Sequence, residues 1–251
     1  MTVHFECTQC GKCCQHLRLT LSVAEAITWA ERGHTVQILV EALPWAGDPD
    51  PDDERAVHDR DRSFPARSGD VPIRVAAILV AYHDGGCPHL QADMRCGNYA
   101  ERPRICRIYP LESRRFSPLR PKSKLCPAEA WTPDRPVLTR DGVIADAESR
   151  RIIADHWRVG LEDVATVAAA CAALGLTRAS FANEGLAVHA PAPEALAQAL
   201  RTAREAPAPS PRDWTIVTNR RPTLDMLANA GCNAAWMARG TDYLGSFADE
   251  V

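Results

Sequence analysis

The sequence predicts an α+β fold, in which a small, irregular, metal-stapled cysteine-rich domain (residues 1–135) precedes a mainly helical extension (residues 136–251). Three observations predict this class. Eight of the ten cysteines lie in the first half of the chain. Residues 87–126 are rich in Cys, Pro and Arg and have too few apolar residues to form a core of their own, so a metal is the natural staple. After Pro136, apolar residues recur at helical spacing.

Composition places the chain among ordinary globular proteins. The hydrophobic fraction is 46%, and the formal net charge of −3 gives no overall attraction to nucleic acid or anionic lipid. The N-terminus does not read as a signal peptide, and the longest apolar run, Val164 to Leu176, is too short for a bilayer core of ~30 Å. We therefore expect a cytoplasmic protein with reduced thiols and no membrane partner, and a disulfide framework is the weaker interpretation.

The first half contains several regular elements outside the cysteine motifs. Leu17 to Leu21 alternates in polarity and predicts a short strand. Ser22 and Glu25 form a capping-box pattern ahead of a helix over residues 24–32. Residues 71–82 are rich in apolar and β-branched residues and predict a buried strand, whereas the apolar run 36–42 fits either a helix or a strand.

The second half shows mainly helical spacing. Apolar stripes ended by glycine or proline signals predict three helices, over residues 146–158, 161–174 and 193–205. A Pro-rich linker is expected near residues 206–212, followed by a strand over 213–218 and a short helix over 223–230. Cys171 lies on one of the apolar stripes and is predicted to be a core residue rather than a ligand.

The cysteine motifs carry the chemistry. Four thiols, Cys7, Cys10, Cys13 and Cys14, lie within eight residues, and four more follow, at Cys87, Cys96, Cys106 and Cys126. A C-x2-C turn lets two thiolates reach one metal, and a third cysteine at the same spacing is similar to a ferredoxin-type ligand run. Side chains of neighbouring residues diverge in extended backbone, so either Cys13 and Cys14 serve different centres or one of them is a bystander.

Eight thiols divide into two sets of four, which fits two tetrahedral zinc sites, or one iron–sulfur cluster (4Fe-4S) and one Zn²⁺ site. The spacing does not assign ligands between two such centres. His16 and His89 stand near the motifs as less favoured replacements for a thiol. Between Arg95 and Lys124 there are nine basic residues against two acidic ones. They fit charge compensation for a thiolate site or a solvated face; nucleic acid is disfavoured because no aromatic stacking series accompanies them.

The ordered combination of motifs resembles a known family. The motifs are Phe5-x-Cys7-x2-Cys10-Gly-x-Cys13-Cys14, Cys87-Pro-His-Leu90, Cys96-Gly-Asn-Tyr99-x2-Arg102-Pro103-x2-Cys106-Arg107-Ile-Tyr109-Pro110 and finally Cys126. They resemble the CxxCxxCC family of YkgJ-type cysteine-cluster proteins, described as zinc- or iron-chelating domains, over about residues 5–21 and 85–131. The resemblance implies metal binding through all eight cysteines, with an iron–sulfur cluster in some members.

Three functions remain open from the sequence. The first is an iron–sulfur or zinc protein with a redox or metal-handling role. The second is a cluster-supported enzyme such as a protein lysine N-methyltransferase, because the family includes a domain similar to flagellin lysine N-methylase. The third is a structural zinc module that presents the second half to an unidentified protein or small-molecule partner. The chain has no G-x-G-x-x-G turn that would indicate a nucleotide-like cofactor.

Overall fold

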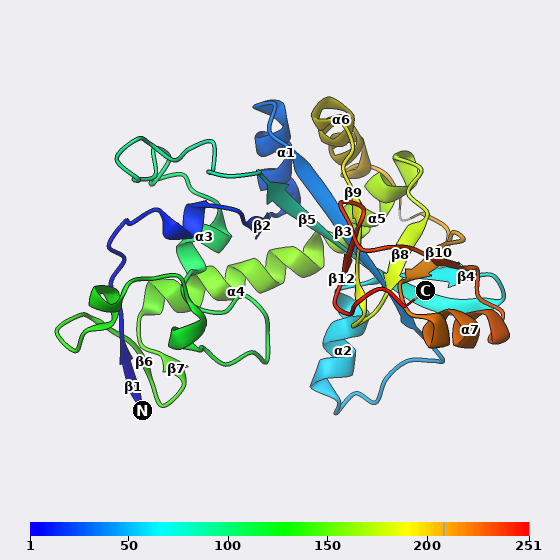
Figure 1. The fold of residues 1–251 in the computed structure, drawn as a ribbon, viewed down its shortest axis with the longest axis horizontal. Helices are drawn as coiled ribbons and strands as arrows, with labels where there is room; N and C mark the ends of the chain where they lie inside the picture. Colours follow the sequence, from blue (N-terminus) through cyan, green and yellow to red (C-terminus); the bar gives the residue numbers. More distant parts are fainter. Residues whose placement is uncertain (208, 251) are drawn as a thin grey trace. The chain divides into compact units, whose positions relative to one another are not determined.

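The computed structural model describes residues 1–207 and 209–250, and the chain forms two compact units, each built from two segments (Figure 1). Unit 1 comprises Met1–Leu21 and Ala81–Val159, and unit 2 comprises Ser22–Val80 and Gly160–Val251. The mixture of helices and strands is consistent with the predicted α+β class. The predicted boundary near residue 135 follows composition rather than contacts, and as a functional division it stays a prediction.

Unit 1 combines a small sheet with short helices. Strand β1 (Thr2–His4) pairs antiparallel with β6 (Val137–Arg140), which in turn pairs with β7 (Val143–Ile144). The other elements of this part of the chain are the 3-10 turns η1 (Lys12–Cys14), η2 (Pro121–Ser123) and η3 (Ala128–Trp131), the strand β2 (Arg18–Thr20), and the helices α3 (Arg104–Ile108) and α4 (Ala147–Glu162). The predicted strand at residues 17–21 and the predicted helix at 146–158 are thus confirmed.

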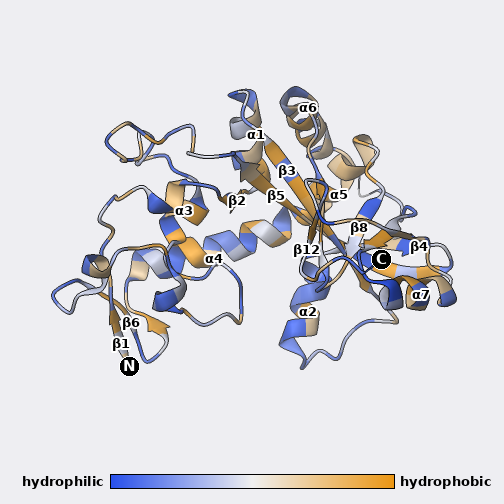
Figure 2. Cartoon of the chain, viewed as in Figure 1, coloured by the Kyte–Doolittle hydropathy of each residue, from blue (hydrophilic) through white to orange (hydrophobic). Residues whose placement is uncertain are grey.

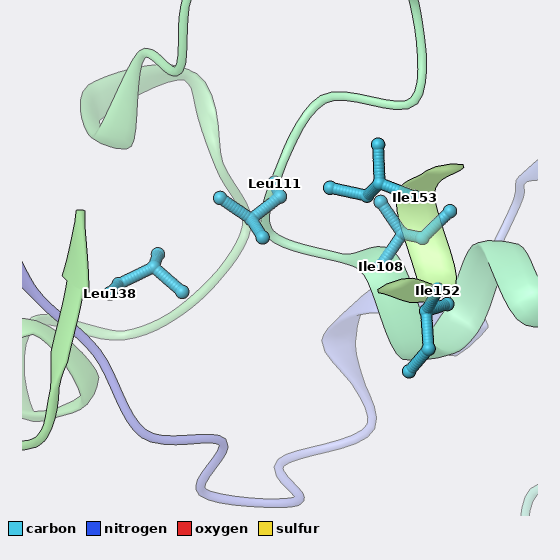
Figure 3. Close-up of a cluster of buried hydrophobic side chains, with 5 residues drawn as sticks. All are labelled: Ile108, Leu111, Leu138, Ile152 and Ile153. Carbon is cyan, nitrogen blue, oxygen red and sulfur yellow. The ribbon is translucent and has the colours of Figure 1, made fainter. Parts of the chain in front are cut away.

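A hydrophobic cluster holds unit 1 together. Its buried members come from α3 and the turn after it, from β6 and from α4, and they are Ile108, Leu111, Leu138, Ile152 and Ile153 (Figure 3). The Phe5 ring packs against Trp131 with 4.8 Å between the centroids, and the Trp157 indole donates a hydrogen bond to the Ser113 carbonyl at 2.7 Å.

The cysteine-bearing segment ahead of this cluster has no core of its own. Residues 82–107 contain no buried residue, and Gly11 is the only buried position among residues 1–20. Apolar burial is the main favourable term in folding, so these segments gain little stability from it. A bound metal would supply the stability that apolar burial does not, and metal binding stays a prediction here.

Unit 2 is built on a mixed sheet with the strand order β11-β10-β8-β3-β5. The parallel pairs join β3 (Val36–Pro44) to β8 (Arg178–Phe181), β8 to β10 (Thr215–Thr218), and β10 to β11 (Ala234–Trp236). The antiparallel pairs join β9 (Gly185–His189) to β3 and to β12 (Tyr243–Gly245), and β4 (Phe64–Ser68) to β5 (Val71–Tyr82). Strands β3 and β5 are mainly orange in Figure 2, as expected for strands covered on both faces.

Five helices accompany this sheet among the described residues: α1 (Val23–Glu31), α2 (Glu54–Asp61), α5 (Val164–Ala173), α6 (Pro193–Ala203) and α7 (Arg221–Asn229). Both α1 and α5 pack against α6. Cys171 is 0% exposed within α5, which agrees with the core role predicted for it. Among the described residues, none of the helices combines the length and the apolarity that a membrane crossing requires.

The predictions for unit 2 succeeded where the signal was local. The strand over 71–82 is confirmed as β5, and the run 36–42 proves to be a strand. The mainly helical extension is not confirmed, because residues 136–251 alternate helices with strands of two to five residues, of which only β10 (Thr215–Thr218) coincides with a predicted strand. The predicted linker at 206–212 includes Ala208, which lies outside the described residues.

The start of α1 allows a test of local sequence signals. The Ser22 hydroxyl accepts from Glu25 N at 3.3 Å, and Ser22 N donates to the Glu25 carboxylate at 2.8 Å, which completes the predicted capping box. We expect Ser22→Ala to cost about 1 kcal/mol of the free energy of unfolding, because one of the helix's first N–H groups loses its acceptor. Urea unfolding measures this change, with exposed Thr28→Ala as a control expected within about 0.5 kcal/mol of the wild type. An equal effect of both substitutions would contradict it.

Candidate metal centre

Backbone hydrogen bonds join the first cysteine motif to the second. Cys87 N donates to the Cys14 carbonyl at 2.7 Å, and His16 N donates to the Gly85 carbonyl at 2.8 Å. These bonds form an antiparallel contact between two segments about seventy residues apart in the sequence. The thiols of Cys14 and Cys87 are therefore held in the same region by the main chain rather than by side-chain packing.

Gly11 makes a close approach that no other residue type allows. Its φ of +69° is in the left-handed region, and a Cβ at this position would lie 2.5 Å from the Met94 carbonyl oxygen and 3.1 Å from Leu90 Cδ1. The next turn of the loop is closed by a hydrogen bond from Cys14 N to the Gly11 carbonyl at 2.9 Å. Glycine thus lets the Cys7–Cys14 loop lie directly against the Cys87–Cys96 segment.

The remaining cysteines come from a tight loop, a helix and a turn. Cys96 pairs with Leu90 in an isolated antiparallel bridge, which closes the loop between Cys87 and Cys96. Cys106 lies in α3, where its N–H bonds to the Pro103 carbonyl at 3.0 Å. Cys126 follows Leu125, whose N–H donates to the Tyr109 hydroxyl at 2.8 Å.

All ten cysteines are free thiols, so no disulfide accounts for the motifs. Cys7 is exposed, and the other clustered thiols are half-buried. Cys13 and Cys14 interact directly: a hydrogen bond between their sulfurs lowers the pKa of Cys13 to about 7 and raises the pKa of Cys14. A thiolate is the species that binds metal, and Cys13 is thus partly deprotonated at neutral pH.

The pKa shifts of the other thiols reveal which sulfurs are neighbours. Burial raises the pKa of Cys106 to about 12 and that of Cys126 to about 11. Repulsion between like charges adds to both shifts, and Cys13 contributes in each case. The further contributors to Cys106 are Cys87 and Cys96, and the further contributors to Cys126 are Cys10 and Cys7. Each of the eight sulfurs therefore lies within electrostatic range of at least one other, with Cys13 common to both groups.

The thiols are gathered without forming a finished ligand set. Within residues 1–207 and 209–250, no three Cys, His, Asp or Glu side chains are placed so that they could hold a metal ion. The donor chemistry nevertheless fits: eight free, mutually repelling thiols suit a thiophilic metal such as zinc or the iron of an iron–sulfur cluster. A bound cation would relieve the repulsion that raises these pKa values.

Among the basic residues near the thiols, Arg102 is the one whose charge reaches them. Its guanidinium lies 3.9 Å from the centroid of the Tyr99 ring, and its charge lowers the pKa of both Cys13 and Cys106. Arg107, also predicted to support the thiols, instead pairs with Glu148 at 3.0 Å. This pairing is with α4, so Arg107 contributes to packing within unit 1.

Sequence reasoning missed the direct contact that Tyr109 makes with a thiol. The Tyr109 hydroxyl hydrogen-bonds the Cys126 sulfur. Burial raises the pKa of Tyr109 to about 12, so the hydroxyl stays protonated at neutral pH. Spacing alone gave no signal of this contact, because Tyr109 and Cys126 are joined by a loop with little periodicity.

The site is thus a cluster of free thiols, gathered from separate segments that bury almost no residues of their own. Residues 6–127 match the model of the CxxCxxCC family, described as "Putative zinc- or iron-chelating domain". The match confirms the resemblance that the motifs predicted for this part of the chain. No curated protein and no solved structure matches the chain.

Proposed function

We propose that the eight clustered cysteines bind iron–sulfur or zinc centres and that the protein has a redox or metal-handling role. One observation carries the proposal. Cys13 interacts electrostatically with thiols from every other cysteine-bearing segment, because its charge affects Cys14, Cys87, Cys106 and Cys126. Free thiols brought together from distant segments repel one another once ionised, and metal binding is the common reason for such an arrangement.

The interaction partners favour two ligand sets. Cys106 is influenced by Cys87 and Cys96, and Cys14 by Cys87 and Cys106. Cys126 is influenced instead by Cys10 and Cys7. We therefore assign Cys14, Cys87, Cys96 and Cys106 to one centre, and Cys7, Cys10, Cys13 and Cys126 to the other. This division also places the adjacent Cys13 and Cys14 on different centres; because both lie in the 3-10 turn Lys12–Cys14 and their sulfurs hydrogen-bond each other, the two centres would be neighbours.

Metal binding would also supply the stability that the cysteine segments lack. Residues 82–107 have no buried residue, and small domains of this kind draw their folding free energy from bound metal. When bound, an iron–sulfur cluster supplies one-electron redox chemistry, whereas zinc supplies a structural link. The chain's own residues tune either centre: Arg102 compensates thiolate charge, and the Tyr109 hydroxyl donates a hydrogen bond to Cys126.

Anaerobic purification followed by metal and sulfide analysis tests the proposal. We expect at least one metal centre per chain, and removal of the metal by a chelator should lower the melting temperature, because the cysteine segments lose their staple. A coloured protein whose visible absorption is bleached by dithionite would identify a redox-active cluster. A colourless protein holding only zinc would retain metal binding and exclude the redox role. Metal-free protein with an unchanged melting temperature would overturn the proposal.

A further inference from the structure

A second polar cluster lies in unit 2, independent of the cysteines. Strands β8, β10 and β11 are parallel, so their carboxyl ends meet at one edge of the sheet. The residues that follow these ends include Glu184 after β8, Asn219 and Arg220 after β10, and Arg239 after β11. Ligands of open α/β sheets bind outside the carboxyl ends of the strands. This edge is therefore the part of the sheet where a binding site is expected.

A short segment of the same chain, Ser246–Glu250, is bound at this edge through its main chain. Its backbone forms hydrogen bonds with residues that follow a parallel strand or lie at a strand end. These bonds run from Ser246 N to Glu184 O (2.8 Å), from Asn219 Nδ2 to Phe247 O (2.8 Å), from Glu250 N to Asn219 O (2.9 Å) and from Trp236 Nε1 to Glu250 O (3.0 Å). Bonds of this kind recognise a peptide irrespective of its sequence.

The acidic side chains of the segment are recognised as well. The Asp249 carboxylate accepts from Asn219 Nδ2 at 2.9 Å and from Arg239 N at 3.0 Å. The Glu250 carboxylate accepts from Arg220 Nε at 3.4 Å. The Arg220 guanidinium also lies 4.8 Å from the centroid of the Phe247 ring, within the range of a cation–π contact. These contacts select an aromatic residue followed by carboxylates.

Two of the residues that hold Ser246–Glu250 are buried, whereas the segment itself is exposed. Glu184 is 7% exposed, and its carboxylate accepts from the hydroxyls of Thr218 and Thr223, both at 2.6 Å. Asn219 is 0% exposed, and its Oδ1 has no hydrogen-bond partner within residues 1–207 and 209–250, so it can still accept a bond. Phe247, in contrast, is 44% exposed. A segment held by polar contacts with little apolar burial opens at low free energy.

We propose that Asn219, Arg220, Trp236 and Arg239, together with the Glu184 carbonyl, form a binding site for an acidic peptide of a partner protein. Ser246–Glu250 occupies the site within its own chain and is displaced when the partner peptide binds. The partner is defined by the complementary chemistry: a free main chain, an aromatic side chain and carboxylates that meet the arginines. Because no cysteine takes part, the site functions whether or not metal is bound.

The experiment compares full-length proteins in their binding of a fluorescent Ser-Phe-Ala-Asp-Glu peptide, followed by anisotropy. In the double variant Asp249→Asn/Glu250→Gln, the internal segment loses its charged contacts. We expect this variant to bind the peptide at least tenfold more tightly than the wild type. The control Asp225→Asn removes an exposed carboxylate on α7 and should bind like the wild type.

A second arm tests the acidic specificity without any further change to the protein. The neutral peptide Ser-Phe-Ala-Asn-Gln should bind the double variant at least tenfold more weakly than the acidic peptide, because it offers no charge to Arg220. Absence of acidic-peptide binding to the double variant, with its melting temperature unchanged, would show that Ser246–Glu250 is only a structural element and would overturn the proposal. Equal binding of both peptides would overturn it too.

Discussion

Replacing Cys13 by serine is expected to remove more than half of the bound metal. Cys13 is the thiol whose charge affects members of both proposed ligand sets, Cys106 in one and Cys126 in the other. Its pKa of about 7 also leaves it partly deprotonated at neutral pH, in the form that binds metal. A serine hydroxyl is a poor ligand for zinc or iron, so the centre that contains Cys13 should be lost and its neighbour loosened.

Metal content per chain, measured under anaerobic conditions, checks this expectation. Cys171→Ala is the matched control: Cys171 is 0% exposed in α5 of unit 2, so its loss should leave the metal content unchanged. Cys7→Ser provides a graded comparison, because Cys7 belongs to the same proposed set as Cys13 but is exposed. Full metal content in Cys13→Ser would show that the thiols gather for another reason.

The melting temperature provides an independent reading of the same variant. Since residues 82–107 have no buried residue, loss of metal should destabilise unit 1 more than loss of one thiol does by itself. Cys13→Ser and wild-type protein should therefore differ in melting temperature as purified, when the wild type holds more metal, and should converge after chelation. A difference that persists unchanged in metal-free samples would assign the effect to packing.

Local sequence signals predicted the elements that local interactions stabilise. The Ser22–Glu25 capping box and the strand Val71–Tyr82 could both be found because each depends on residues adjacent in the chain. Strands β8 and β9 pair with β3, which lies more than half of the chain away in the sequence, and Gly185–His189 is a strand because β3 and β12 flank it. Pairing of this kind overrides local propensity, so spacing does not reveal it.

The same distinction applies to the site. The spacing of Cys7, Cys10 and Cys13 indicates thiolate chemistry, because it depends on residue type and local geometry alone. The bond between Cys87 N and the Cys14 carbonyl, and the contact of Tyr109 with Cys126, are tertiary and could not be predicted. Which thiols share a centre depends on the tertiary contacts between the segments. Local spacing does not contain this information.

Gly11→Ala tests whether metal binding requires the close contact between the Cys7–Cys14 loop and the Cys87–Cys96 segment, in addition to the thiols. The substitution removes no ligand. The backbone φ of +69° at this position costs alanine about 1–2 kcal/mol. The added Cβ would in addition lie 2.5 Å from the Met94 carbonyl oxygen, which belongs to the backbone and cannot move alone. Overpacking of this kind costs about 1–3 kcal/mol more. We therefore expect a loss of roughly 2–5 kcal/mol in the stability of unit 1.

Gly85→Ala separates the two causes. Gly85 has a φ of +92° and no atom within 4 Å of an added Cβ, so alanine there meets the backbone cost without the clash. If the close approach of the Cys7–Cys14 loop to Met94 positions the thiols, Gly11→Ala should weaken metal binding at least tenfold, while Gly85→Ala should bind metal nearly as the wild type does. Competition with a chromophoric chelator measures both affinities. Equal affinities in the two variants would mean that the thiols reach the metal without this contact, and that the loop is ordered by the metal alone.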